Sequence, residues 1–475
     1  AGTAVAFVDM NRDGFADMVV GASRFDSNRG RVCVVFGKGG LAGQQASTLD
    51  VLSGANGFCL EGATSGDRLG VSVAAAGDVN SDGYPDLIVG ADGRDEIGSN
   101  AGAAYVYFGR ASHPATISVD DLSSGSIGFK IVGSVAGALL GTSVGGGGDF
   151  DGDGVEDLVV GAPGEGKAYV IYGSTAPFAS IYTHNMSCAD GLVLAHAERS
   201  FAFGQAVSSA GDFNADGKAD VLIGAPDGGV DTREDAGFAY AIYGRASTCP
   251  GAEVSVPDDL DGSNGFGVLG YDAVGHLGFA VSAGGDVDGD GIGDIVLGAY
   301  GAAAAGVSGA GETYVLYGTR TALPPLFEAG TLHEANTNGT QGFVIRGTAP
   351  NEWSGYSVAG GSDVDGDGLS DIVVGAVRNG CGGANVGGAY VVYGVSDRSQ
   401  RVGGVLDLGS ASERAAAKFA GAREDGGAGT SVGAGGDVNG DGLGDVLVGS
   451  PDSTPGMASV VFGRDFKADA FAPDA

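Results

Sequence analysis

Short apolar runs, each bounded by glycine or aspartate, recur along the whole chain. The second copy of the repeated passage reads LGVSVAAAGDVNSDGYPDLIVGAD, then GAAYVYFG, then GFKIVG. Each run has the length and the Val, Ile, Tyr and Phe content of a β-strand. No segment sustains the 3.6-residue period that an amphipathic helix requires. The repeating unit is therefore predicted to be a four-stranded antiparallel meander.

The passage occurs seven times, which predicts the architecture. Its Asp-rich core begins at Asp9, Asp78, Asp149, Asp212, Asp286, Asp363 and Asp437, at intervals of 63 to 77 residues. One such sheet cannot bury both of its faces, whereas seven sheets stacked around an axis cover one another. We predict an all-β fold, a seven-bladed β-propeller of four-stranded antiparallel blades. It forms a single domain, 1–475, with blades at about 1–62, 63–133, 134–197, 198–270, 271–347, 348–421 and 422–475.

Blade seven lacks a clear outer strand. The chain starts at the first strand of blade one, and its last strand-like run covers residues 459–462, before the tail RDFKADAFAPDA. Three sources could supply the missing strand: this tail, a stretch of chain beyond this sequence, or a partner chain through strand addition. The third source leaves self-assembly through blade seven open.

Composition narrows the classes of partner. The chain has 94 glycines in 475 residues, and 24 basic against 59 acidic residues, for a formal net charge of -35. This balance argues against binding nucleic acid or anionic membranes, both of which need clustered Lys and Arg. No apolar run approaches the ~18 residues of a membrane span, so direct membrane insertion is not expected. The start of the chain carries no secretory signal and suggests a mature or trimmed product.

The Asp-rich core follows the pattern D-x-[DN]-x-D-G-x-x-D in all seven copies. Ca²⁺ takes six to eight oxygen ligands, and side chains at positions 1, 3 and 5 of a tight loop converge on one point. Position 7 offers its backbone carbonyl, position 9 closes the shell, and glycine at position 6 permits the sharp turn. A single copy could be an ordinary Asp-rich turn, but seven copies predict up to seven Ca²⁺ ions. The predicted ligands are Asp9, Asn11, Asp13, Phe15, Asp17; Asp78, Asn80, Asp82, Tyr84, Asp86; Asp149, Asp151, Asp153, Val155, Asp157; Asp212, Asn214, Asp216, Lys218, Asp220; Asp286, Asp288, Asp290, Ile292, Asp294; Asp363, Asp365, Asp367, Leu369, Asp371; Asp437, Asn439, Asp441, Leu443 and Asp445.

Two details refine this prediction. Position 12 is apolar and opens the next strand, so the loop is a strand–loop–strand site and not an EF-hand. Position 3 is aspartate in blades three, five and six (Asp151, Asp288 and Asp365) and asparagine elsewhere. We expect these three blades to bind calcium more tightly. Without metal, carboxylates crowded in one loop should raise one another's pKa.

The Asp loop, the Phe-Gly pairs and a following Gly-Ala-Pro resemble the FG-GAP repeat. The full form stands at Gly161-Ala162-Pro163 and Gly224-Ala225-Pro226, with relaxed versions in the other blades. Over essentially its whole length the chain resembles the propeller headpiece of integrin α subunits and their relatives. The resemblance implies a seven-bladed propeller, an extracellular, secreted or cell-surface location, and a role in adhesion or ligand binding. Two departures are that every blade carries a calcium loop and that the inserted adhesion domain, the stalk and the membrane anchor are absent.

The face opposite the calcium loops is the expected site for a protein or glycan ligand, because its loops vary most. Trp353, the only tryptophan, lies in one of them and could be an exposed binding platform or packing between blades. Asn-x-Ser/Thr sequons stand at Asn185 and Asn338 and could be glycosylated, or could occur by chance.

Cysteine and histidine add little chemistry. Disulfides are possible for Cys33 with Cys59 and for Cys188 with Cys249; the alternative is small buried side chains, and Cys381 is left over. The five histidines are scattered and expected to be solvated loop residues, so no catalytic site is predicted. The first hypothesis is a non-catalytic adhesion or ligand-binding module. The alternatives are a structural subunit of a surface layer or extracellular fibre, a carbohydrate-binding lectin, and a non-catalytic domain of a larger enzyme.

Overall fold

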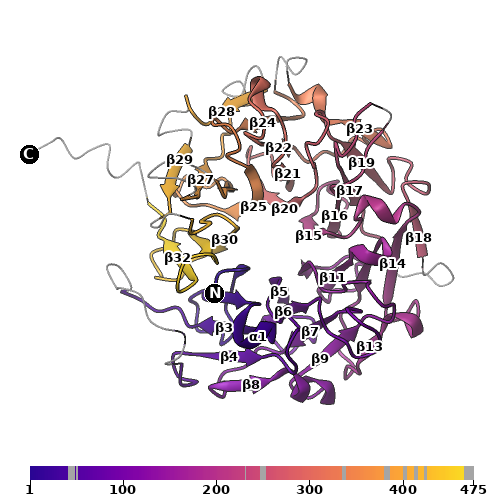
Figure 1. Cartoon of the computed structure of the whole chain (residues 1–475), viewed down its shortest axis with the longest axis vertical. Helices are drawn as coiled ribbons and strands as arrows, with labels where there is room; N and C mark the ends of the chain where they lie inside the picture. The colour runs from indigo at the N-terminus through magenta and orange to yellow at the C-terminus, as the bar shows by residue number, and fades with distance from the viewer. Residues whose placement is uncertain are drawn as a thin grey trace, which may run out of the picture.

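Seven β-sheets stand around a common axis, as the computed structural model in Figure 1 shows. The structure describes residues 1–40, 49, 52–230, 232–246, 253–333, 339–378, 386–398, 404–410, 416–421 and 425–464. The innermost strand of each sheet contacts the innermost strands on both sides. These contacts run from β1 (Val5–Val8) through β5 (Val73–Gly77), β10 (Val144–Gly148), β15 (Ala206–Gly211), β20 (Ala280–Gly285), β25 (Ser354–Ser362) and β30 (Ser431–Gly436) back to β1. The ring is therefore closed, and the predicted seven-bladed propeller is confirmed.

Within each blade the strands run outward in chain order and pair antiparallel. After the innermost strand come β2 (Asp17–Ala22), β3 (Arg31–Val35) and β4 (Gly57–Glu61) in blade one; β6 (Asp86–Ala91), β7 (Ala103–Tyr107) and β9 (Gly128–Val132) in blade two; β11 (Asp157–Ala162), β12 (Lys167–Ile171) and β14 (Gly191–His196) in blade three; β16 (Asp220–Ala225), β17 (Phe238–Ile242) and β19 (Gly265–Leu269) in blade four; β21 (Asp294–Ala299), β22 (Glu312–Leu316) and β24 (Gly342–Arg346) in blade five; β26 (Asp371–Ala376), β27 (Gly388–Val392) and β29 (Ala416–Ala420) in blade six; and β31 (Asp445–Ser450) and β32 (Met457–Val461) in blade seven.

The uniform four-stranded blade of the sequence analysis is wrong in detail. The sheets of blades one to five carry a fifth strand, which pairs in parallel with the fourth and comes from the next blade's connection between its third and fourth strands. These added strands are β8 (Thr116–Ser118), β13 (Ile181–Tyr182), β18 (Glu253–Val256), β23 (Leu326–Glu328) and β28 (Val405–Asp407). An outer strand exposes unpaired backbone groups, and the added strand satisfies them. The sequence repeat defines the strands of one blade, so it did not predict a strand pairing between two neighbouring blades.

Blades six and seven differ from the rest within the described residues. Blade six has four strands and blade seven has three, with β32 outermost. The tail after residue 464 lies outside the described residues, so the three sources proposed for the missing strand stay predictions.

In the part of the chain that the structure describes, helical structure occurs only as short turns in the connections. These are α1 (Phe25–Asn28), η2 (Val119–Ser124), η3 (Pro163–Glu165), η4 (Thr183–Asn185), η5 (Arg199–Phe201), η6 (Ala304–Gly306) and η7 (Ala329–Leu332). Among the described residues no helix is long and apolar enough to cross a membrane.

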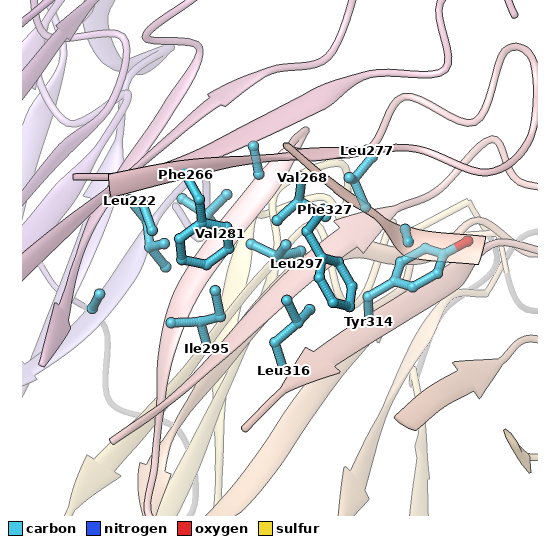
Figure 2. Close-up of a cluster of buried hydrophobic side chains, with 14 of the residues drawn as sticks. Leu222, Phe266, Val268, Leu277, Val281, Ile295, Leu297, Tyr314, Leu316 and Phe327 are labelled. Carbon is cyan, nitrogen blue, oxygen red and sulfur yellow. The ribbon is translucent and has the colours of Figure 1, made fainter. Parts of the chain in front are cut away.

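The hydrophobic core lies between blades. Second strands such as β6 and β21 are buried at every position, because a neighbouring blade covers each of their faces. Figure 2 shows one such layer, in which Leu222 and Phe266 of blade four pack with Ile295 and Tyr314 of blade five. Burying each large apolar side chain contributes roughly 1.5–3 kcal/mol. A blade therefore owes its stability to its neighbours, and this stacking holds the loops at its ends in place.

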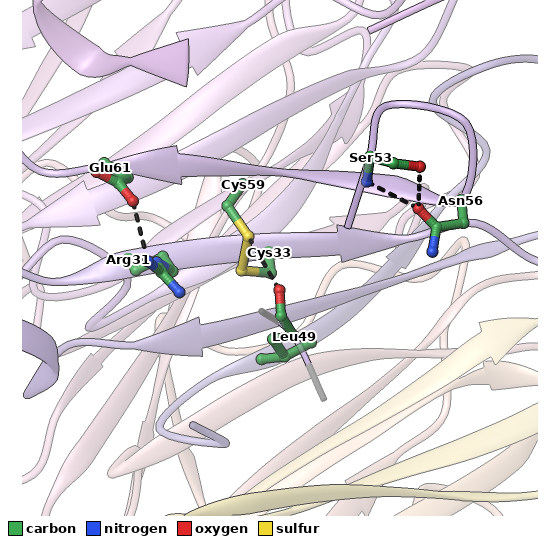
Figure 3. Close-up of a disulfide and its surroundings, with 7 residues drawn as sticks. All are labelled: Arg31, Cys33, Leu49, Ser53, Asn56, Cys59 and Glu61. Atoms are coloured by element: carbon green, nitrogen blue, oxygen red, sulfur yellow. Dashed lines mark hydrogen bonds and ion pairs between the residues drawn. A yellow bond between two sulfur atoms is a disulfide. The ribbon is translucent and has the colours of Figure 1, made fainter. Parts of the chain in front are cut away.

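One disulfide fastens blade one. Cys33 on β3 and Cys59 on β4 are direct partners in the antiparallel register and are joined by an S–S bond of 2.05 Å (Figure 3). Cys188 is disulfide-bonded as well. The first predicted pair is confirmed, whereas Cys249 and Cys381 lie outside the described residues. Stable disulfides are typical of proteins from oxidising compartments.

Candidate metal centres

All seven Asp-rich loops lie at the same end of the propeller. Each loop joins the first strand of a blade to the second, and the first strands all run in the same direction through the ring. Neighbouring loops are also in register. A glycine follows the third strand of every blade, and the residue after it donates its backbone N–H to the carbonyl at loop position 2 of the preceding blade. This bond joins all seven pairs of neighbouring blades. The loops therefore form a ring of equivalent sites.

The blade-four loop shows how the pattern turns the chain. Asp212 accepts the N–H of Asp216 at 2.9 Å and the N–H of Gly217 at 2.9 Å. Asn214 accepts the Asp216 N–H at 2.9 Å, and Asp216 accepts the Lys218 N–H at 2.9 Å. These bonds wind the loop so that side chains 1, 3 and 5 converge. The other six loops repeat all four bonds.

Two loop positions adopt left-handed backbone. The position-6 glycine has φ between 82° and 93° in every blade, as the sequence predicts. Position 4 is left-handed as well, even where it is not glycine: Arg12, Ser81 and Ala215 have φ of 55°, 55° and 56°. This second left-handed position was not predicted, because its residue type varies from loop to loop. The left-handed backbone strains these three non-glycine residues, and the loop's hydrogen bonds offset that strain.

The position-9 aspartate does more than close a ligand shell. In blade four, Asp220 is fully buried and accepts the N–H of Phe213 at 3.0 Å and the N–H of Gly244 at 2.9 Å. One bond holds the start of the metal loop, and the other holds the end of the third strand. The same pair of bonds recurs in the other six blades. This aspartate is thus a structural anchor, a role that spacing alone did not indicate.

Burial is the main cause of the pKa shifts at position 9. It raises the pKa to about 8 for Asp86 and Asp294, to about 7 for Asp17, Asp157, Asp220 and Asp371, and to about 6 for Asp445. Backbone N–H bonds act in the opposite direction, and neighbouring carboxylates add smaller increases. The expectation that mutual repulsion is the cause is therefore only partly right: desolvation dominates.

The donor set fits a hard divalent cation. In blades three, five and six, three carboxylates offer oxygens that lie within 4.8 Å of one another: Asp149, Asp151 and Asp157; Asp286, Asp288 and Asp290; Asp363, Asp365 and Asp371. Ligands at 2.3–2.6 Å on opposite sides of Ca²⁺ stand roughly 5 Å apart, so one ion can reach all three. These are the blades with aspartate at position 3.

In the four loops with asparagine at position 3, a side-chain hydrogen bond within the loop replaces the third carboxylate. The Asn214 side-chain amide donates to Asp216 at 3.0 Å, and the same bond joins positions 3 and 5 in blades one, two and seven at 2.8–3.0 Å. A cation would compete with this bond. The loops therefore fall into two electrostatic classes, as the position-3 residues suggested.

The opposite face carries an aromatic cluster around Trp353. The ring of Trp353 lies 6.1 Å from Tyr356, nearly parallel to it, and 5.4 Å from Tyr300 of blade five. The guanidinium carbon of Arg378 sits 3.5 Å from the centroid of the Trp353 ring. Trp353 is half-buried and bridges two blades, so it is less exposed than a free platform. Its aromatic partners were not predicted, because Tyr300 follows β21 of blade five and Tyr356 lies on β25 of blade six.

The remaining predicted sites are mixed. Asn185 is exposed at the end of η4, and Asn338 lies outside the described residues; glycosylation of both stays a prediction. The expectation of solvated histidines is wrong for His113, His196 and His333, which are 7%, 7% and 6% exposed. His113, for example, stacks on Phe58 at 4.4 Å, because the connection that carries it folds back over the neighbouring blade.

Fold and loops together define a β-propeller in which every blade presents an Asp-rich cation loop at one face. The family model for the FG-GAP repeat matches residues 1–35, 69–107, 140–174, 203–242, 277–316, 354–392 and 428–463. The matches cover more than half of the chain and all seven blades. The chain therefore belongs to the FG-GAP repeat family.

Integrin alpha chains and a phospholipase are among the relatives of this chain. The chain is 29% identical over 243 residues to integrin alpha pat-2 of Caenorhabditis elegans (49% of this chain, 17% of the relative). It is 40% identical over 121 residues to human integrin alpha-7 (23% and 9%). It is also 35% identical over 183 residues to phosphatidylinositol-glycan-specific phospholipase D of Bos taurus (35% and 19%). The chain thus matches less than a fifth of the length of each of these relatives.

Proposed function

We propose that this chain is an extracellular, calcium-binding FG-GAP propeller that binds a protein or glycan ligand through the face opposite its calcium loops. The module itself performs no catalysis. The observation that carries the proposal is the ring of seven Asp-rich loops in the same register, three of which bring three carboxylate oxygens within 4.8 Å of one another. The similarity to integrin alpha chains and the disulfide in blade one support the location and the role in adhesion.

Calcium has a structural task in this proposal. Each ion would neutralise the carboxylates at positions 1, 5 and 9, and at position 3 in blades three, five and six, and would tie the first two strands of its blade together. Because ions that bind only the folded state stabilise it, each site adds about 2.7 kcal/mol at a hundredfold excess of calcium over Kd. The opposite face would then be a rigid platform for a ligand.

The ligand surface is proposed to centre on Trp353. Its aromatic neighbours and Arg378 offer stacking area and a cation, a combination suited to sugar rings, aromatic side chains or carboxylates. A glycan array and a panel of purified extracellular-matrix proteins serve as probes, with Trp353→Ala as the test and Tyr84→Ala on the calcium face as the matched control. We expect at least a tenfold loss of binding in the first variant only. Equal binding by both variants would move the ligand away from this cluster.

Calcium binding is tested separately by isothermal titration of chelator-treated protein. We expect uptake of several ions and a rise in the unfolding midpoint. A midpoint that calcium does not change would contradict the structural role. Sedimentation at rising protein concentration tests the alternative of a surface layer or fibre, which requires assembly.

A second candidate is a non-catalytic domain of a larger enzyme. The similarity to phosphatidylinositol-glycan-specific phospholipase D favours it, since the match covers only 19% of that relative. In this case too the propeller would bind and not catalyse. The isolated chain should therefore fail to release a glycosylphosphatidylinositol-anchored reporter from vesicles. Release of the reporter would show that the chain is catalytic and would refute this part of the proposal.

A further inference from the structure

An arginine from blade six reaches the calcium loop of blade five. Arg398 lies in the connection that follows β27, and the Val395 N–H in that connection bonds to the Val287 carbonyl at 2.9 Å. Val287 is position 2 of the blade-five loop, so the connection is anchored on the loop itself. From there the Arg398 guanidinium forms ion pairs with Asp288 and, at 2.8 Å, with Asp290.

The arginine occupies the side of the loop where a cation would bind. Asp288 and Asp290 are positions 3 and 5, and with Asp286 their oxygens lie within 4.8 Å of one another. The Asp288 side chain is 0% exposed, whereas that of Arg398 is 31% exposed. Its guanidinium carbon also lies 4.8 Å from the centroid of the Tyr317 ring. A buried carboxylate requires a compensating charge, and Arg398 supplies it.

Blade three provides the comparison within the same chain. Its loop has the same aspartates at positions 1, 3 and 5, but among the described residues no Lys or Arg forms an ion pair with them. Burial raises the pKa of Asp151, and the charge of Lys218 opposes this rise without making such a contact. The two loops therefore have the same ligands but a different competing charge.

We propose that Arg398 is a built-in cation of the blade-five loop and competes there with calcium. The inference rests on the proposed calcium binding, and it revises the expectation that blade five, like blades three and six, binds calcium more tightly than the blades with asparagine at position 3. A guanidinium offers no ligand to a metal ion, and its charge repels one. Calcium must therefore displace Arg398 before it can bind Asp288 and Asp290, so the blade-five site binds calcium more weakly than the blade-three site.

The test counts and ranks bound ions in the full chain. Chelator-treated wild-type protein is titrated with calcium alone by calorimetry, and its stoichiometry is measured by native mass spectrometry, alongside Arg398→Gln and Arg398→Lys. We expect the Gln variant to tighten one site by about tenfold or more, equivalent to ~1.4 kcal/mol of pairing. The Lys variant keeps the charge and should leave that site weak. The double variant Arg398→Gln/Asp288→Ala should lose the tightened site, which assigns it to blade five.

Thermal unfolding separates competition from a merely structural ion pair. In EDTA, Arg398→Gln should unfold at a lower temperature than the wild type, since its carboxylates lose their partner. In saturating calcium it should equal or exceed the wild type. A lower midpoint in both conditions, or calcium affinities that the Gln substitution leaves unchanged, would overturn the inference while the proposed calcium binding stands. A wild-type protein that takes up no calcium would overturn both.

Discussion

The position-9 aspartate is where structure and metal binding can be separated by experiment. Asp220 in blade four is 0% exposed, and its two oxygens accept the N–H groups of Phe213 and Gly244. Asp216, at position 5 of the same loop, is exposed and accepts the Lys218 N–H at 2.9 Å. Both are candidate ligands for the same ion, but only Asp220 supports buried backbone. Asparagine at each position therefore has a different expected cost.

The size of the Asp220→Asn effect follows from the lost acceptor. One carboxylate oxygen becomes an NH₂ group, which cannot accept, so one buried backbone N–H remains unsatisfied at a cost of about 1–3 kcal/mol. This cost needs no metal and should appear in EDTA. Asp216→Asn changes an exposed side chain, so its cost in EDTA should be within ~0.5 kcal/mol. In calcium it should forfeit the stabilisation by its ion, about 2.7 kcal/mol at a hundredfold excess over Kd.

Chemical denaturation of the wild type and of both variants, with calcium and with EDTA, is the assay. Asp220→Asn should lower the free energy of unfolding under both conditions, whereas Asp216→Asn should do so only in calcium. The reasoning would be refuted if Asp220→Asn had no effect in EDTA. The two N–H bonds would then not contribute to stability as their burial implies.

Three further predictions concern other parts of the propeller. Burial lowers the pKa of His113 from 6.5 to about 4. The neutral side chain therefore contributes about 3 kcal/mol to the free energy of unfolding above pH 6.5, and this contribution is lost as the pH falls through 4. Denaturation across this pH range should show a smaller decrease in the free energy of unfolding for His113→Phe than for the wild type. Replacing Cys33 and Cys59 by alanine opens a loop with a sequence separation of 26 residues and should lower the free energy of unfolding by about 3 kcal/mol. An unchanged denaturation midpoint would contradict this and would show that the denatured chain retains structure in this loop. Ser370→Pro removes an N–H that donates to the carbonyl of the first aspartate of the blade-five loop at 2.9 Å. Because Pro85 occupies the same loop position in blade two, the backbone should accommodate proline, and the free energy of unfolding should fall by only ~1 kcal/mol. A loss several times larger in chemical denaturation would show that more than this bond joins the two loops.

The asparagine and aspartate loops illustrate how far local reasoning reaches. The converging side chains, the left-handed glycine and the two classes of loop depend on residues within nine positions of one another. Such contacts form wherever the chain turns, so the pattern in the sequence was sufficient to predict them. The number of blades followed in the same way, from counting a unit that cannot bury its own faces.

Contacts between distant segments were beyond that reasoning. The Asp220 carboxylate meets Gly244, 24 residues away, and Arg398 meets Asp290, 108 residues away. The added parallel strands also join one blade to the next. The first pair forms when the strands of one blade pair with each other, and the others form when neighbouring blades stack and their connections fold over one another.

The amino-acid sequence by itself thus determined the repeating sheet, the ring of blades and the oxygen donors of each loop, since these rest on short-range turns and on strand periodicity. Closure of the ring decided which carboxylates are desolvated, which basic side chain faces which loop, and that Trp353 packs against aromatic residues of two blades. The physical reason is that desolvation and charge pairing depend on what covers a residue, and in a propeller that cover comes from another repeat.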